Sequence, residues 1–286
     1  MASPTPAQPT TSFVTTDDGV RVAYTQAGPP SGQNLVFVPG WRQTAAQWRK
    51  QVSHFQATHR VTTYDHRGHG ASDEPGFGHR VHRYAADLLG LLEHLGLSRV
   101  HVVAHSMGCS VVWALFDVLP ARARDRVAGL VLVDQSPCMV ASPAWTPQEA
   151  VRSAAIFSPD TASELARDMH ESTAALLGAM FTEGVGAEDR AWALQQNYLM
   201  SDESAAVLLQ NHANMDWRDV LPRLDVPTLV VAAERSAFPA EGIREVGERI
   251  PGAKVVTFGK EEGGSHFMFW ENPEKFNRIV EEFCKP

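Results

Sequence analysis

The chain has 286 residues, of which 44% are hydrophobic and 20% charged, and its formal net charge at pH 7 is -8. This length is sufficient for one substantial hydrophobic core. The negative charge, without any Lys- or Arg-rich run, argues against nucleic acid and anionic membranes as partners. We therefore expect a small-molecule substrate, no nucleic-acid or membrane partner, and a monomer or homodimer.

The N-terminal segment and the cysteines indicate the cellular setting. Residues 1–12 are rich in Pro and Thr and lack an apolar stretch, so we predict a disordered tail without a secretion signal. Cys109, Cys138 and Cys284 are odd in number and unpatterned, which indicates neither a disulfide framework nor a zinc cluster. No later segment approaches the roughly 20 apolar residues of a membrane span. We expect a cytoplasmic protein without a metal or other cofactor.

From Phe13 onward, apolar runs of strand length alternate with helical patterns, which is typical of a mostly parallel sheet flanked by helices. The chain opens with SFVTTDDGVRVAYTQAG, whose Asp-Asp-Gly turn separates two short strands and predicts a hairpin. Six further strands are predicted in NLVFVPG, HRVTTYD, RVHVVAHS, VAGLVLVD, PTLVVAA and AKVVTF. Helices are predicted in TAAQWRKQVSHFQA, HRVHRYAADLLGLLEHLGL, PAEGIREVGERI and NPEKFNRIVEEFC.

A region without strand patterns interrupts this alternation between about residues 142 and 219. It consists of Ala-rich helical segments that carry many of the aromatic residues and methionines of the chain. We therefore predict a helical cap over 142–219, inserted into a core formed by 13–141 and 220–286. An apolar, aromatic inner face of this cap would favour a bulky, largely apolar substrate.

The stretch VHVVAHSMGCS places Ser106 between a buried strand and an apolar helix. Ala104 and Gly108 keep the side chains two residues away on either side small, as a sharp strand-to-helix turn requires. Backbone N–H groups at the start of a helix favour negative charge, so an oxyanion beside Ser106 would be stabilised there. Ser106 is therefore the candidate nucleophile, in a form of the G-x-S-x-G pattern with Ala104 at the first glycine position.

The motifs VPGW, YDHRGHGAS, the turn at Ser106 and GGSHF occur in an order that resembles the α/β-hydrolase fold superfamily, from about residue 13 to the end. The resemblance implies an α/β protein with a mostly parallel eight-stranded sheet, flanking helices and an inserted helical cap. It implies His266 of GGSHF as the catalytic base. It also implies an oxyanion hole formed by the backbone N–H groups of Trp41 and Met107. His66 and His69 of YDHRGHGAS are expected to shape their loop rather than to react.

The acid of such a triad is not at its usual place. The superfamily commonly carries an aspartate shortly after the strand that matches PTLVVAA, and the corresponding residue here is Ser236. Two carboxylates remain, Asp134 at the end of VAGLVLVD and Glu234 two residues before Ser236. We favour Asp134, because parallel sheets build their sites at the carboxyl ends of strands and some superfamily members use an acid there. Its role would be to accept the Nδ1 proton of His266.

The substrate pocket is predicted from residues near these motifs and within the cap. They are Trp41, Gln43, His105, Trp145, Phe181, Trp192 and Phe267. The main hypothesis is a serine hydrolase that cleaves a carboxylic ester or lactone of a bulky, largely apolar small molecule through an acyl-enzyme.

An alternative is a cofactor-independent dioxygenase that opens a hydroxyquinolone-type ring. Such enzymes share the fold, and Pro-Gly-Trp ending at Trp41, the pair His105-Ser106, and Asp134 resemble their pattern. Their His–Asp pair deprotonates the substrate while the serine orients it. They carry a histidine two residues after the tryptophan, where this chain has Gln43, so this hypothesis stays second. A non-catalytic binding protein is a third possibility, against which the intact serine and histidine argue.

Overall fold

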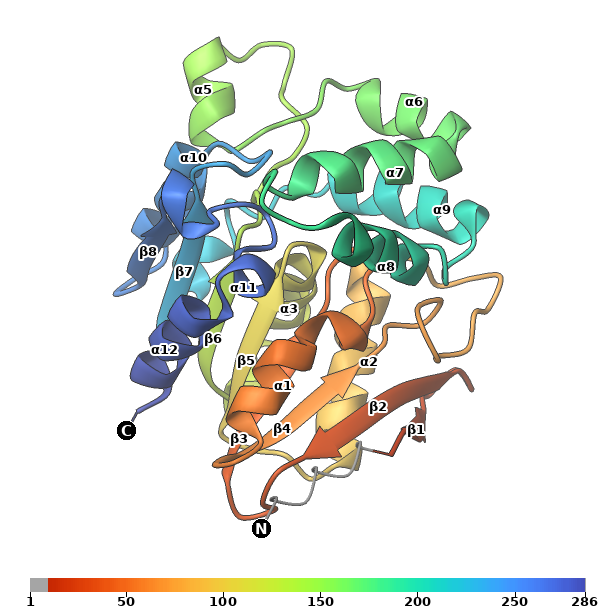
Figure 1. Cartoon of the computed structure of the whole chain (residues 1–286), viewed down its shortest axis with the longest axis vertical. Helices are drawn as coiled ribbons and strands as arrows, with labels where there is room; N and C mark the ends of the chain where they lie inside the picture. Colours follow the sequence, from red (N-terminus) through yellow and green to blue (C-terminus); the bar gives the residue numbers. More distant parts are fainter. Residues whose placement is uncertain (1–9, 286) are drawn as a thin grey trace.

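A computed structural model of the chain describes residues 10–285, and its central feature is one eight-stranded sheet (Figure 1). The strand order is β1-β2-β4-β3-β5-β6-β7-β8. The strands are β1 (Ser12–Thr15), β2 (Arg21–Ala27), β3 (Gln33–Val38), β4 (His59–Tyr64), β5 (Val100–His105), β6 (Val127–Val133), β7 (Thr228–Ala233) and β8 (Lys254–Phe258). β2 pairs antiparallel with β1 and with β4, and all other neighbouring strands are parallel. This confirms the predicted α/β fold with a mostly parallel eight-stranded sheet.

The chain enters the sheet through the predicted hairpin. Gly19 has a φ of +84°, and the N–H of Thr16 donates to the carbonyl oxygen of Val20 at 2.9 Å, which closes the turn. The predicted tail, 1–12, falls largely outside the described residues. Its last residue, Ser12, belongs to β1 instead, because it pairs with Tyr24 of β2.

The helices cover both faces of the sheet. Figure 1 shows α1, α11 and α12 on one face and α2 and α3 on the other. The helices are η1 (Ala45–Trp48), α1 (Arg49–Phe55), α2 (Val81–His94), α3 (Met107–Val118), α4 (Pro120–Arg126), α5 (Pro147–Arg152), α6 (Thr161–Arg167), α7 (Met169–Met180), α8 (Ala187–Asn197), α9 (Asp202–Ala213), η2 (Leu221–Arg223), α10 (Ala240–Arg249), η3 (Lys260–Glu262), α11 (Met268–Glu271) and α12 (Pro273–Cys284).

The parallel strands are buried on both faces, and each face has its own hydrophobic core. Val36 and Val38 of β3 belong to the core on the α2 and α3 side. Leu35 and Phe37 belong to the other core, which contains Trp48 of η1. Successive side chains of a strand point to opposite faces of the sheet. A sheet with a core on each face therefore needs the near-continuous apolar runs seen in the sequence.

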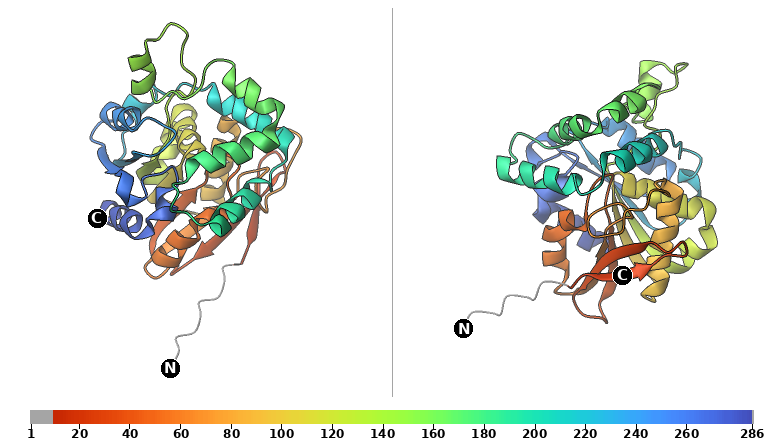
Figure 2. Two further views of the ribbon diagram at one scale, coloured as in Figure 1. Left: turned by 45° about the horizontal axis from the view of Figure 1, so that its top comes forward. Right: turned by 90° about the vertical axis from the view of Figure 1, so that its right-hand side faces the viewer.

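Helices α5–α9 lie between β6 and β7 in the sequence and beyond the carboxyl ends of the parallel strands in space (Figures 1 and 2). They occupy the region in which the cap was predicted, and the division at residues 142 and 219 stays a prediction. Within residues 10–285, no helix combines the length and apolar character that crossing a bilayer requires.

Candidate active site

Ser106 occupies a strained turn between β5 and α3. Its φ is +54° and its ψ is -128°, a conformation that non-glycine residues rarely adopt. The backbone N–H of Ser106 donates to the carbonyl oxygen of Val133 on β6 at 2.9 Å, which fixes the turn to the neighbouring strand. A Cβ atom at Gly108 would lie 2.7 Å from the carbonyl oxygen of Val38, so only glycine fits there. The turn therefore needs the small residue that the sequence provides at this position.

The loop after β3 passes directly beside this turn. A Cβ atom at Gly40 would lie 3.0 Å from the Cβ atom of Ser106. Within residues 10–285, the backbone N–H groups of Trp41 and Met107 have no protein hydrogen-bond partner. Met107 is the first residue of α3, where N–H groups have no acceptor within the helix. Both N–H groups are therefore available to a negatively charged oxygen next to Ser106.

His66 and His69 support this loop. The Nε2–H of His66 donates to the carbonyl oxygen of Pro39 at 3.0 Å. His69 donates from Nδ1 to the carbonyl oxygen of Arg67 at 3.0 Å and accepts at Nε2 from the N–H of Arg42 at 3.0 Å. Burial lowers the pKa of His66 to about 4 and that of His69 to about 3, so both rings are neutral near pH 7.

A buried histidine–carboxylate pair lies close to the turn. The Nδ1–H of His266 donates to Asp134 Oδ2 at 2.7 Å, and the ring centroid of His266 lies 4.4 Å from that of His105, the residue before Ser106. His266 Nε2 is buried and has no partner among the described residues, and no hydrogen bond joins it to Ser106 there. Such bonds often form only when substrate is bound. The pair is thus oriented for a base whose Nε2 accepts a proton.

The two candidate acids differ sharply in their surroundings. Asp134 follows β6 with a φ of +50° and is fully buried, whereas Glu234 is exposed and its Oε2 accepts from the N–H of Lys260 at 3.3 Å. Within residues 10–285, no hydrogen bond or ion pair joins Glu234 to His266. Burial raises the pKa of Asp134, and the hydrogen bonds from His266 and Ser236 oppose this rise.

Ser236, at the position where the acid was expected, hydrogen-bonds the carboxylate of Asp134. Its Oγ donates to Asp134 Oδ2 at 2.5 Å and accepts from the N–H of Phe238 at 3.2 Å. Asp134 Oδ2 therefore receives two donors, while Oδ1 is buried without a protein partner in the part of the chain that the structure describes.

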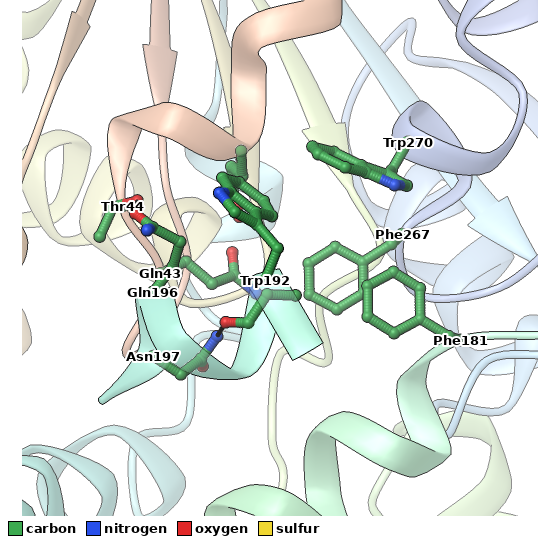
Figure 3. A pocket seen from close by; sticks show the side chains of 10 residues that line it. Gln43, Thr44, Phe181, Trp192, Gln196, Asn197, Phe267 and Trp270 are labelled. Carbon is green, nitrogen blue, oxygen red and sulfur yellow. Dashed lines mark hydrogen bonds between the residues drawn. The ribbon is translucent and has the colours of Figure 1, made fainter. Parts of the chain in front are cut away.

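A small cavity of about 20 Å³, partly open to solvent, is lined by Phe267, the residue that directly follows His266 (Figure 3). Its apolar wall is formed by Phe181, Trp192, Ala193, Phe267 and Trp270. Its polar wall is formed by Gln43, Thr44, Gln47, Gln196 and Asn197. In Figure 3 Phe181, Phe267 and Trp270 lie on the right and Thr44, Gln43, Gln196 and Asn197 on the left. Four of the residues predicted to form the pocket, Gln43, Phe181, Trp192 and Phe267, meet here.

Two residues predicted to form the pocket do not line this cavity. The indole Nε1–H of Trp41 donates to the carbonyl oxygen of Ala205 at 3.1 Å, so this side chain packs under α9. Trp145 lies instead against Arg218, whose guanidinium carbon is 4.6 Å from the indole centroid.

His105 also lies outside the cavity wall, and it is fully buried. Its Nδ1 is 2.9 Å from Gln43 Oε1, and its Nε2 is 2.9 Å from the carbonyl oxygen of His266. Both are acceptors, and burial lowers the pKa of His105, so the neutral ring donates to one of them at a time. His105 thus connects Gln43 to the backbone of His266.

Several residues at the site were not predicted. Gln47 and Trp270 line the cavity, and Arg42 joins the loop after β3 to helices α7–α9. The only sequence signal for Gln47 is that it precedes Trp48 within a helical segment, and this signal does not specify a site. Among the described residues, no group of three or more His, Cys, Asp or Glu side chains is placed to hold a metal ion.

Comparisons with known proteins identify the family to which this fold belongs. The family model for the alpha/beta hydrolase fold matches residues 33–273. A non-heme chloroperoxidase from Streptomyces lividans is 31% identical over 284 residues, which cover 95% of this chain and 99% of that protein. A bromoperoxidase from Bacillus anthracis superimposes with a TM-score of 0.86 at 23% identity, over 97% of this chain and 100% of that one. A thermophilic esterase from Thermogutta terrifontis has a TM-score of 0.77 at 26% identity, over 97% and 98%.

Proposed function

The chain belongs to the α/β-hydrolase fold family, and from this premise we propose that it is a serine hydrolase of carboxylic esters or lactones of bulky, largely apolar small molecules. The observation that carries the proposal is the buried 2.7 Å hydrogen bond between His266 Nδ1 and Asp134 Oδ2, close to the strained turn at Ser106. The similarity to an esterase at 26% identity supports the same class of reaction.

In this mechanism, Ser106 Oγ attacks the carbonyl carbon of the ester and its proton passes to His266 Nε2. Asp134 holds the Nδ1 proton and stabilises the imidazolium that forms. The backbone N–H groups of Trp41 and Met107 donate to the tetrahedral oxyanion. The alcohol leaves with the proton from Nε2, and an acyl-enzyme remains on Ser106. Water then attacks the acyl carbon as His266 accepts its proton, and the acid product is released with the serine regenerated.

The test is to replace the nucleophile and to label it. We expect Ser106→Ala to reduce turnover of a short-chain p-nitrophenyl ester by about 10⁴-fold or more, because no acyl-enzyme can form. A fluorophosphonate should add its mass to Ser106 of the wild type and leave the variant unlabelled. Ser110→Ala, which removes a hydroxyl one turn further along α3, is the matched control and should retain most of the activity. A Ser106→Ala variant with near-normal ester turnover would rule out the acyl-enzyme.

The dioxygenase is the second candidate function. It is favoured by the acid directly after β6 and by Pro-Gly-Trp after β3, and it is disfavoured because this chain has Gln43 where such enzymes carry a histidine. Oxygen consumption with a hydroxyquinolone, together with no fluorophosphonate labelling, would replace the hydrolase by this function. In that case Ser106→Ala should weaken substrate binding more than it slows the reaction.

The name of the Streptomyces lividans relative suggests a second acceptor for the acyl group. Hydrogen peroxide in place of water would attack the acyl carbon, give a peroxy acid and restore the serine hydroxyl. Peroxide-dependent halide oxidation that needs a carboxylic ester and is lost in Ser106→Ala would assign both activities to one acyl-enzyme. Oxidation that survives in Ser106→Ala would separate it from the proposed mechanism.

A further inference from the structure

The corner between α7 and α8, residues 181–186, controls access to the active site in the inference drawn here. We propose that this corner is a lid, that the Phe181 ring is its gate, and that the hydrogen bonds from Thr182 to Glu271 are the latch that holds it closed. As a statement about substrate entry, this rests on the proposed hydrolase function. The motion itself requires no serine chemistry, so the two can fail separately.

The proposed catalytic groups are covered by other side chains. Ser106 is 8% exposed and His266 is 1% exposed, and His266 Nε2 is itself buried. The cavity at Phe267 has a volume of about 20 Å³, which is room for about one water molecule. An ester that contacts Ser106 and His266 together is much larger than a water molecule. A covering group must therefore move before an ester reaches both side chains.

The Phe181 ring covers the residue next to the proposed base and has a second place to go. It stacks on Phe267 with centroids 4.5 Å apart and planes at 19° (Figure 3), and Phe267 directly follows His266. Phe181 also lines a groove of about 160 Å³ between α7 and α8, whose other apolar walls are Ala174, Leu177, Ala191 and Leu194. An apolar cavity of about 150 Å³ holds a benzene molecule, so this groove has room for a phenyl ring. Rotation of Phe181 into the groove would uncover Phe267.

A second phenylalanine, Phe238, also lies against the proposed base, with its ring centroid 5.6 Å from that of His266. Its N–H donates to Ser236 Oγ at 3.2 Å, and Ser236 in turn donates to Asp134. Movement of Phe238 would therefore disturb the bonds of the proposed acid. Phe181 can move without breaking a bond of the catalytic pair, which makes it the better gate.

Two hydrogen bonds hold the corner to α11, which lies beside it (Figure 1). The N–H of Thr182 donates to Glu271 Oε1 at 2.9 Å, and its Oγ1 donates to Glu271 Oε2. Within residues 10–285, these are the only hydrogen bonds between residues 181–186 and the chain outside the cap. A groove of about 420 Å³, open to solvent, runs along the same seam. The latch is therefore the main polar connection of the corner to the core.

Arg190 preserves the shape of the corner when the latch opens. Its guanidinium donates to three backbone carbonyl oxygens, those of Gly178 at 3.3 Å, Thr182 at 2.5 Å and Val185 at 3.1 Å. None of these bonds involves Glu271. α8 is held to α11 separately, by the stack of Trp192 on Trp270 with centroids 5.0 Å apart. Loss of the latch should therefore free the corner without unfolding the cap.

Fluorine NMR tests the gate directly. 4-Fluorophenylalanine is placed at position 181 of the Ser106→Ala protein, so that no chemistry contributes. The fluorine of the open ring is more exposed to solvent than that of the stacked ring, and its shift between water and heavy water measures the open population. We expect Glu271→Ala to increase this population by about fivefold to tenfold, because the closed state loses two hydrogen bonds.

Glu261→Ala is the matched control for this measurement. Glu261 lies on the wall of the same open groove, and its side chain has no hydrogen bond or ion pair within residues 10–285, so the open population should not change. Thr182→Val removes one of the two bonds and should give a smaller increase. It replaces Glu271→Ala if thermal melting shows that this variant does not fold. Fluorine spectra that stay the same when the latch is removed would overturn the lid.

A turnover test separates this inference from the proposed function. We expect Glu271→Ala to raise kcat/KM for p-nitrophenyl benzoate by about fivefold to tenfold, mainly through a lower KM, because apparent affinity scales with the open share of the protein. Damage to the fold alone would lower kcat/KM. Hydrolysis by the wild type with an unchanged or lower kcat/KM in Glu271→Ala overturns the lid alone. An open population that rises in Glu271→Ala, without ester hydrolysis by any form of the protein, overturns the hydrolase and retains the lid.

Discussion

At the scale of single residues, rigidity as well as position makes Asp134 the better candidate for the acid of the proposed catalytic pair. Asp134 is short, fully buried and fixed at the end of β6, so little side-chain entropy is lost when it accepts from His266. Glu234 is longer, exposed and bonded to the backbone of Lys260. A carboxylate orients an imidazole only when it is itself held in place.

Replacing each carboxylate by its amide tests this argument. Asp134→Asn keeps the shape but presents an amide to Nδ1, which favours the wrong tautomer of His266. We expect kcat to fall by about 10² to 10⁴-fold. Glu234→Gln, the matched change on the exposed loop, should leave kcat close to that of the wild type. The opposite ranking of the two variants would return the acid to the loop after β7.

Ser236 leads to a prediction about pH. Its hydroxyl donates to the oxygen of Asp134 that also accepts from His266, and this bond lowers the pKa of a carboxylate that burial raises. Without the donor the ionised form is less stable, so the acidic limb of the kcat–pH profile should move to higher pH in Ser236→Ala. The limb belongs to the coupled pair rather than to one residue. Ser236→Thr, which keeps the hydroxyl, should restore the profile, and an unshifted limb in Ser236→Ala would contradict the argument.

At the scale of elements, the strands were predictable because both faces of the parallel sheet are buried. Each of the six apolar runs forms a strand that pairs in parallel with at least one neighbour, and the Asp-Asp-Gly turn marks the hairpin. Helices α4 and α11 were not predicted. They have seven and four residues, which is too short for a helical period to stand out from the apolar background.

The residues of the candidate site also divide into those that a local motif predicts and those that only tertiary packing brings together. Ser106 and His266 lie in motifs that need only a few neighbouring residues to be recognised. The contacts of Arg42 could not be predicted, because its partners Asn197 and Thr173 are 155 and 131 residues away in the chain. Gln47 and Trp270 meet only when η1 and α11 come together over the sheet. Such pairs depend on tertiary packing, which a local sequence pattern does not predict.

Arg42 joins the loop after β3 to helices α7–α9. Its buried guanidinium donates to Asn197 O at 2.9 Å, Thr173 Oγ1 at 2.6 Å, Met200 O at 2.6 Å and Asp202 Oδ1 at 2.7 Å. Trp41, whose N–H belongs to the proposed oxyanion hole, directly precedes it. The placement of that N–H is therefore coupled to the placement of these helices.

Removing the Arg42 guanidinium should loosen both the loop after β3 and helices α7–α9. We expect Arg42→Met to destabilise the protein by about 2 to 4 kcal/mol, because several buried acceptors lose their donor. Amide hydrogen exchange should rise in α7 and α8 but not in β5 and β6, and kcat should fall. Asp202→Asn is the control and should have a small effect, since its amide oxygen still accepts and the residue is partly exposed. Unchanged exchange in α7 and α8 of Arg42→Met would contradict the coupling.

At the scale of the whole molecule, buried histidines make stability depend on pH. Burial lowers the pKa of His66 to about 4 and those of His69 and His212 to about 3. An unfolded chain binds these protons near pH 6.5, so below that pH the unfolded state holds more protons than the folded state. The stability that these neutral histidines contribute is therefore fully present above pH 6.5. It is lost as the pH falls toward their pKa values in the folded state. Each histidine contributes about 1.4 kcal/mol per pH unit over this range.

His212 allows one of these contributions to be isolated. Its pKa is lowered by burial alone, and its buried Nδ1 has no hydrogen-bond partner within residues 10–285. In His212→Leu we expect the slope of unfolding free energy against pH, between about pH 6 and 5, to decrease by about 1.4 kcal/mol per unit, which is one proton. Urea unfolding at several pH values measures this slope. His212→Gln should give the same slope at a different absolute stability, because the proton that His212 binds, and not the polarity of the side chain, sets the slope.

Burial raises the pKa of Asp65 and Asp134, and these carboxyls oppose the loss of stability at lower pH. Their opposing effect is present in every variant, so the difference between wild type and His212→Leu isolates the histidine. A slope unchanged in both variants would mean that His212 is protonated alike in the folded and unfolded states.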